Sequence, residues 1–301
     1  MSSTLIKTIN NGKWSWSDYL IKRVTRLWIV LIPCLILTYI IGNIQVSIFG
    51  YHKLVESLNW QTFVGNIFFL QKILVDPYGM NGPLWSLSYE FCYYLLFPCL
   101  ILTIHSKTVG KKAFYLTLFI SIALFVGPHI MLYFLVWMLG AIIPFIKLLN
   151  LQDKKIQSVI TLFSLALLFI SMNYPATMAT FLKDIKVGIT SALFVYIIIS
   201  FYNQESSNLK TNIPKHLAGF SFTLYLAHYP LANLILTWLV SPLWPFSKTT
   251  LLVKVVLALS VLTYSWFLAM ITERHTEVLR KSIQKVILKQ QNSSDTKQVE
   301  I

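Results

Sequence analysis

Two arginines three positions apart, Arg23 and Arg26, stand at the start of the first long apolar segment, with Lys22 beside them. Guanidinium groups bind phosphate oxygens through paired hydrogen bonds, so this spacing suits a phosphate-bearing ligand. Basic residues at the mouth of a membrane helix also anchor it by contacting lipid head groups. Taken alone, anchoring is the simpler interpretation, and the residue types leave both open.

A carboxylate, Glu90, lies inside the second long apolar segment. Burying an ionisable group in hydrocarbon is costly unless the group is paired or faces water. Helical spacing places Ser86, Glu90 and Tyr94 on one face, with Tyr93 adjacent, and Pro83 suits the first helical turn. Glu90 therefore has two interpretations. It acts as a base, a cation ligand or an orienting group, or it is a structural carboxyl in interhelical hydrogen bonds.

A histidine and a second glutamate mark two later segments. His228 lies within the apolar stretch 221–230. It either serves a site or donates to a carbonyl one turn away, such as one that Pro230 leaves open. Glu273 and Arg274 close the last apolar segment, and a helix-end ion pair is the alternative to a functional role.

The sequence lacks the common catalytic motifs of soluble enzyme domains. It has no Walker loop, dinucleotide fingerprint, zinc signature or GxSxG elbow. The three cysteines, an odd number, all lie in apolar runs and have no metal-ligand spacing, which argues against a disulfide framework and a metal site. We interpret them as small apolar helix residues. Any chemistry must therefore take place among apolar helices.

The composition indicates that those helices lie in a membrane. Of the 301 residues, 56% are hydrophobic and 12% are charged, against about 25% charged in an ordinary soluble domain. The net charge of +14 does not indicate nucleic acid, because the basic residues fall between apolar runs and not on one polar face.

The apolar runs predict an all-α polytopic membrane protein with about eight transmembrane helices. They lie near residues 27–49, 84–104, 113–127, 130–147, 156–173, 187–202, 217–240 and 251–271. A further apolar stretch, 60–75, is interrupted by polar residues, and we interpret it as a re-entrant or interfacial helix. The predicted membrane domain covers 1–272, with 1–26 as a cytoplasmic lead and 273–301 as a basic cytoplasmic tail.

The lysines and arginines predict the orientation of these spans. With the N-terminus in the cytoplasm, every inside connection is basic, including one with Lys210 and Lys215, and so is the tail with Lys289 and Lys297. The inverted topology would reverse this bias. We therefore expect both termini on the cytoplasmic side, with Arg23 and Arg26 toward the inner leaflet and Glu90 toward the outer one.

Three segments together resemble the membrane-bound acyltransferase 3 family, the integral-membrane O-acyltransferases of bacterial surface polysaccharides. Residues 22–33 are similar to the basic RxxR start of its third span, and residues 82–98 to its WSLxxExxxYLxxP segment. Residues 221–230 are similar to its SYxxYLxHxP span. Residues 271–275 match the terminal Glu of the family more loosely, since His275 replaces the usual proline.

The resemblance implies transfer of an acyl group, most often acetyl from acetyl-CoA, to a hydroxyl of a polysaccharide, such as lipopolysaccharide, or its lipid-linked precursor. Arg23 and Arg26 would bind the CoA phosphates, and Glu90 would support or orient the base. The substrate-side candidates are Trp85, Ser86, Tyr93, Tyr225, His228 and Glu273. No tightly bound cofactor or metal is implied. The partners would be membrane lipid and a glycan in the inner membrane of a bacterium, without nucleic acid and with the oligomeric state left open.

Family members resemble ten-span bundles whose first span carries an arginine and the histidine taken as the base. This sequence begins after the second of those spans, so it resembles an N-terminally truncated member without that histidine. Loss of a base costs about 10²- to 10⁴-fold in rate, so we expect the chain alone to be inactive or severely impaired. The alternatives are a transporter, which repeat symmetry and several intramembrane charges would favour, and a non-catalytic membrane partner.

Overall fold

Helices make up nearly all of the described structure. The computed structural model describes residues 2–173, 180–202, 219–239 and 247–285. The chain divides into two compact units, the first formed by residues 1–14 and 95–211 and the second by 15–94 and 212–301. We describe each unit by itself.

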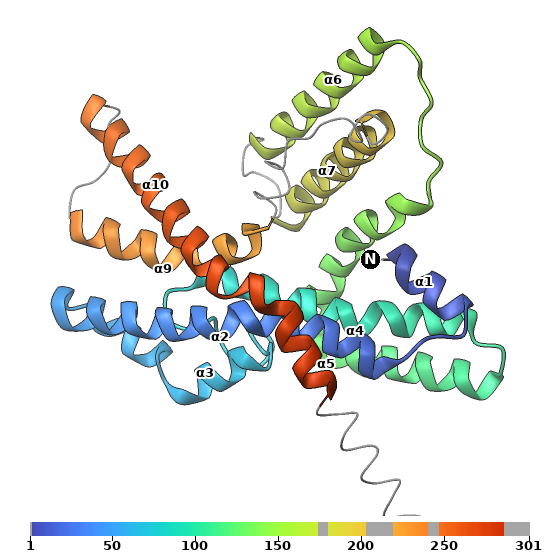
Figure 1. The fold of residues 1–301 in the computed structure, drawn as a ribbon, viewed down its shortest axis with the longest axis horizontal. Helices are drawn as coiled ribbons and strands as arrows, with labels where there is room; N and C mark the ends of the chain where they lie inside the picture. The colour runs from blue at the N-terminus through green and yellow to red at the C-terminus, as the bar shows by residue number, and fades with distance from the viewer. Residues whose placement is uncertain (1, 174–179, 203–218, 240–246, 286–301) are drawn as a thin grey trace, which may run out of the picture. The chain divides into compact units, whose positions relative to one another are not determined.

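The first unit begins with α1, Ser2–Asn10, where the sequence predicted only a polar lead. The other helices are the C-terminal half of α4 (Trp85–His105), α5 (Val109–Ile142), a 3₁₀ turn η3 (Ile143–Phe145), α6 (Lys154–Asn173) and α7 (Thr180–Tyr202). Figure 1 shows α6 and α7 running side by side. The Ser171 and Thr190 hydroxyls join the pair at 2.8 Å.

Helix α5 contains two of the predicted spans. Gly127 has φ 81° and ψ 171°, so the helix is interrupted there, directly before Pro128. Only glycine adopts this φ readily, and proline cannot donate to the preceding turn. The sequence correctly placed a break between the spans 113–127 and 130–147, although no polar loop separates them.

The second unit is built on the long helix α2, Trp16–Phe49. Ser15 caps its start by accepting a hydrogen bond from the Asp18 amide at 3.4 Å, and Gly50 ends it with φ 71°. Its buried face has helical spacing and is formed by Leu27, Val30, Leu31, Cys34 and Leu35, each at most 2% exposed.

Two later helices complete the second unit with α2. Helix α9, Ser221–Leu239, packs against both α2 and α10, Lys248–Ile271. A 3₁₀ turn η4, Glu273–His275, follows α10, and residues 276–285 are again helical. The N-terminal half of α4 joins this unit after the 3₁₀ turn η2, Gly82–Leu84.

The connection from α2 to α4 contains several buried polar side chains. After the 3₁₀ turn η1, His52–Ser57, helix α3 spans only Trp60–Ile67, so the predicted helix over 60–75 is wrong beyond its first half. Phe69 and Lys72 have positive φ, and an isolated bridge joins Gln71 to Val75.

The fully buried amide of Asn66 explains why the helix ends there. The Asn66 Nδ2 donates to the carbonyls of Thr62 at 2.8 Å and Asp76 at 2.9 Å, and its Oδ1 accepts from the Tyr78 amide at 3.1 Å. Burial, with a further effect of Tyr39, raises the pKa of Tyr78 in this loop to about 12.

The structure supports the prediction of a polytopic membrane protein. Within the described ranges, six helical stretches are long and apolar enough to cross a membrane: 16–49, 82–105, 109–145, 154–173, 181–202 and 248–285. The stretch 109–145 contains two predicted spans, which the kink in α5 separates. Helix α9 covers the remaining predicted span, although it is not among the six stretches. The predicted inside charges Lys210, Lys215, Lys289 and Lys297 lie outside the described residues.

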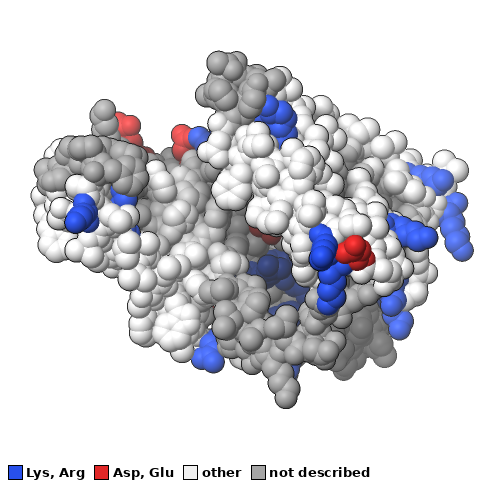
Figure 2. All heavy atoms as spheres, turned by 90° about the horizontal axis from the view of Figure 1, so that it is seen from above, with Lys and Arg blue, Asp and Glu red and all other residues white. Residues whose placement is uncertain are grey.

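Many apolar side chains lie on the surface, as expected for helices that face lipid. Ile48, Leu124 and Val159 are 69%, 78% and 65% exposed. On the face shown in Figure 2, lysine and arginine side chains are scattered, acidic ones are few, and wide areas carry no charge. Such a surface would be unstable in water and suits a bilayer.

Candidate functional site

Arg23 is held between two tyrosine rings. Its guanidinium carbon lies 5.4 Å from the centre of the Tyr19 ring on α2 and 5.1 Å from that of Tyr94 on α4. Both distances are within the range of cation–π attraction. The Arg23 Nε is buried and has no hydrogen-bond partner among the described residues. The guanidinium therefore packs near both rings, and these contacts leave its Nε donor unused.

Tyr94 also reaches Glu90, because its hydroxyl donates to the Glu90 Oε1 one turn earlier on α4. This confirms the predicted stacking of Glu90 and Tyr94 on one helix face. We call Tyr19, Arg23, Glu90 and Tyr94 the arginine cluster. A single tyrosine side chain links Arg23 to Glu90, which does not fit the expectation that they lie toward opposite leaflets.

Arg26 and Lys22 extend the positive charge around this cluster. Both are exposed, on the turns of α2 next to half-buried Arg23. The arrangement offers one guanidinium fixed by packing and two cationic side chains that can move to meet a ligand. Phosphates are the anions that such a mixed group binds well.

A second group of contacts joins the segments around residues 82–98 and 221–230. The Ser86 and Tyr225 hydroxyls lie 2.8 Å apart, and each also donates to the Pro83 carbonyl, at 3.2 and 3.3 Å. The Asn81 Nδ2 donates to the Leu226 carbonyl at 2.8 Å. We call Asn81, Pro83, Ser86, Tyr225 and Leu226 the motif junction.

The carbonyl at this junction is the one that Pro230 leaves open. Leu226 lies four residues before Pro230, which has no N–H to donate to it. Asn81 supplies the missing hydrogen bond. His228 instead uses its Nδ1, 3.0 Å from the Leu224 carbonyl and 2.8 Å from that of Tyr225. These contacts match one of the two interpretations of His228, a bond to a carbonyl one turn away, but the carbonyl freed by Pro230 has Asn81 as its partner.

Glu273 caps a helix. Its Oε1 accepts from the Thr223 amide at 2.9 Å and from the Thr223 hydroxyl at 2.5 Å. Thr223 is the third residue of α9, so the carboxylate satisfies a free N–H at the positive end of that helix. The suggested ion pair with Arg274 is replaced by this cap.

The remaining substrate-side candidates belong to a row of aromatic rings on α4. Trp85 is 39% exposed and packs edge-on against Tyr89 with the ring centres 5.0 Å apart. Tyr93 is buried, and its ring centre lies 6.3 Å from that of Tyr89. Trp85 thus presents a ring at the surface next to Ser86, whereas Tyr93 packs inside.

Sequence reasoning missed the partners of the charged groups more than the groups themselves. Tyr19 and Asn81 received no role, although a tyrosine one turn before an arginine is a recognisable signal for ring packing.

In the first unit, Tyr133 on α5 donates to Asp184 on α7. Asp184 was predicted to lie outside a span, and α7 extends past it.

A family model described as an acyltransferase domain matches residues 3–270. The chain belongs to the acyltransferase 3 family. A search of curated proteins and a search of solved structures each found no match. With its apolar helices, this family member is a multi-pass membrane protein of the acyltransferase type.

Proposed function

We propose that the protein acts in the transfer of an acetyl or other acyl group from acyl-CoA to a hydroxyl of a bacterial surface polysaccharide or of its lipid-linked precursor. The observation that carries this proposal is the arginine cluster. The Arg23 guanidinium packs near two tyrosine rings in this cluster, and the exposed Arg26 lies beside the cluster, one turn along α2.

Acyl-CoA carries several phosphates, and the basic residues of α2 suit them. Arg23 is already ordered by Tyr19 and Tyr94, so little conformational entropy is lost when its N–H groups meet a phosphate. Arg26 and Lys22 add charge that draws the donor to this end of the helix. We place this end on the cytoplasmic side, where acyl-CoA is found, in a bacterial inner membrane with both termini inside.

In the reaction, the acceptor oxygen attacks the thioester carbonyl, a C–O bond forms and the C–S bond breaks. A base takes the proton of the hydroxyl, and the CoA thiolate leaves and takes up a proton. The family resemblance implies that this base is a histidine. Glu90, held by Tyr94, would orient that base or stabilise its charged form.

The motif junction supports a place for the acceptor. Ser86 and Tyr225 hold two hydroxyls 2.8 Å apart beside the exposed ring of Trp85. Sugars are bound by such combinations of hydrogen-bonding groups and an apolar face. Three further residues would support this place indirectly. Tyr93 packs inside, His228 lines a nearby groove, and Glu273 caps α9.

Deleting the gene in its native host and analysing the surface polysaccharide tests this proposal. We expect the deletion to remove an ester-linked acyl group and the intact locus to restore it. A locus with Arg23→Gln and Arg26→Gln should restore little, whereas Lys107→Gln, the loss of an exposed charge in the connection after α4, should restore most. Unchanged acylation after deletion would refute the proposal.

A further inference from the structure

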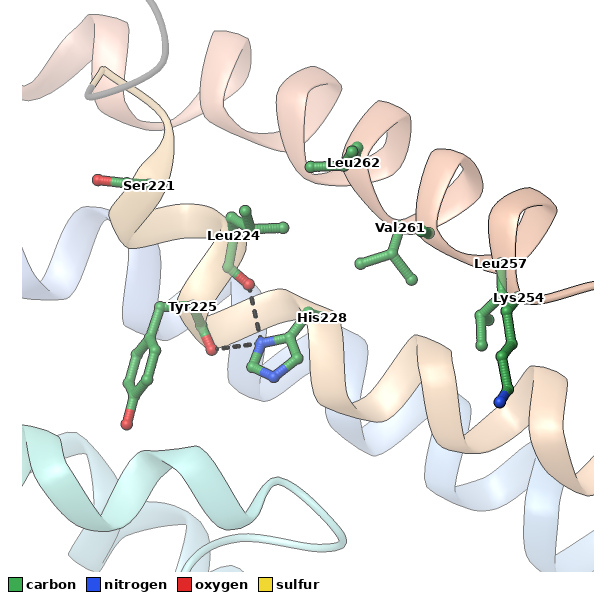
Figure 3. Close-up of a pocket in the computed structure, with 9 residues that line it drawn as sticks. Ser221, Leu224, Tyr225, His228, Lys254, Leu257, Val261 and Leu262 are labelled. Atoms are coloured by element: carbon green, nitrogen blue, oxygen red, sulfur yellow. Dashed lines mark hydrogen bonds between the residues drawn. The ribbon is translucent and has the colours of Figure 1, made fainter. Parts of the chain in front are cut away.

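An open groove of about 630 Å³ runs between α9 and α10 in the second unit (Figure 3). Its α10 wall is apolar and is formed by Leu257, Ala258, Val261 and Leu262, with Lys254 at one end. Leu224 and His228 lie on the α9 side. Its volume is in the range of about 300–1,000 Å³ of ordinary ligand sites.

We propose that this groove binds one anionic phospholipid from the surrounding bilayer, with the phosphate at Lys254 and one acyl chain along the apolar wall. None of the residues of the arginine cluster lines the groove, but Tyr225 and His228 do, so the groove lies beside the place proposed above for the acceptor.

The length of the wall fits an acyl chain. Leu262 lies eight residues after Lys254 on one continuous helix, which corresponds to about 12 Å at 1.5 Å per residue. Half of a bilayer hydrocarbon core is roughly 15 Å thick. A chain whose head group is bound at Lys254 would therefore follow the wall for most of one leaflet.

The charges define the head group. Lys254 is half-buried in an apolar helix, where a lysine extends its amine toward a polar region while its methylenes pack on apolar neighbours. An anionic lipid brings a phosphate to such an amine and has no cationic group of its own to compete with it. A zwitterionic lipid of the same chain length lacks this advantage.

The contacts of His228 favour the head group at the other end of the groove. Its Nδ1 is directed at the Leu224 and Tyr225 carbonyls, at 3.0 and 2.8 Å (Figure 3). This nitrogen therefore bonds within α9 and is not available to a phosphate. The head group binds at Lys254, and the chain ends near His228.

Native mass spectrometry of the purified chain tests the proposal, with phosphatidylglycerol and phosphatidylcholine of identical chains as probes. We expect one tightly retained phosphatidylglycerol and about tenfold weaker phosphatidylcholine. Lys254→Gln should weaken phosphatidylglycerol about tenfold, as the loss of one charge-assisted contact predicts. Ala258→Leu should fill the groove and weaken both lipids. Lys248→Gln and Ser260→Leu, matched changes on α10 outside the groove, should alter neither.

A second measurement locates the lipid without any substitution. Phosphatidylglycerol with a photoreactive group in its acyl chain should label α10 between Leu257 and Leu262 after illumination, as mapped by peptide mass spectrometry. Labelling confined to other helices would overturn the proposal. So would equal binding of the two lipids, or wild-type phosphatidylglycerol binding by both groove variants.

Discussion

The hydrogen bond from Asn81 to the Leu226 carbonyl should be energetically coupled to Pro230. Asn81 is fully buried, and its Nδ2 lies 2.8 Å from a carbonyl that the proline leaves without its usual helical donor. Leaving such a group unpaired costs about 1–3 kcal/mol. Asn81→Leu keeps the branched shape of the side chain, removes the donor, and also removes an Oδ1 that is buried without a partner in the described structure. This relief offsets part of the loss, so we expect a net destabilisation of about 1–2 kcal/mol.

Pro230→Ala supplies the test of the mechanism. The new Ala N–H stands four residues after Leu226 and can donate to the same carbonyl. In that background, Asn81→Leu should cost at least about 1 kcal/mol less than in the wild-type chain, which a double-mutant cycle measures directly.

Reversible unfolding in mixed micelles with increasing dodecyl sulfate, followed by tryptophan fluorescence, measures these differences. Asn43→Leu is the matched control, since Asn43 is exposed on α2 and its only hydrogen bond within the described ranges is to the Tyr39 carbonyl of its own helix, at 2.8 Å. We expect the control to change stability by less than about 0.5 kcal/mol. If Asn81→Leu has the same cost with Pro230 and with alanine, the freed carbonyl does not explain the role of Asn81.

Three further changes test neighbouring parts of the structure. Tyr94→Phe keeps the ring beside Arg23 and should leave acetyl-CoA affinity within about threefold. Tyr94→Leu removes the ring and should weaken that affinity about three- to tenfold, as measured by titration calorimetry. Equal effects of the two substitutions would contradict the ring contact. Glu273→Ala should destabilise the fold by about 1–2 kcal/mol through loss of the α9 cap, and the exposed Glu277→Ala should not, in the same dodecyl sulfate titration. Because the pKa of Tyr78 is raised to about 12, its neutral phenol stabilises the fold fully below pH 10, and this contribution is lost as pH rises toward 12. Tyr78→Phe should flatten that decline in alkaline unfolding curves, and an unchanged slope would refute the assignment.

The sequence predicts the helices well because hydrocarbon imposes a simple rule on them. A span must satisfy its own backbone, so long apolar runs such as that of α2 become helices almost regardless of their neighbours. The break at Gly127 was also predictable, since the residue before a proline is disfavoured in the helical conformation and a glycine leaves it easily. Family motifs added the candidate residues, but not their contacts.

The missed features depend on contacts between segments far apart in the chain. Residues 68–75 are as apolar as a helix, yet the buried amide of Asn66 holds the chain at Asp76 and Tyr78 in a non-helical path. The cap on α9 comes from Glu273, fifty residues later, and not from a neighbouring residue. Hydropathy and spacing carry no information about such pairings.

Acetyl-CoA binding to the purified chain in lipid nanodiscs tests the central claim most directly, because binding does not require the base. We expect saturable binding that Arg23→Gln weakens about tenfold, as loss of a charge-assisted phosphate contact predicts, with a further loss for Arg26→Gln. Lys107→Gln, the loss of an exposed charge outside α2, should have a small effect. The absence of saturable binding, or an affinity unaffected by both arginine substitutions, would contradict the assignment of the arginine cluster to the acyl donor.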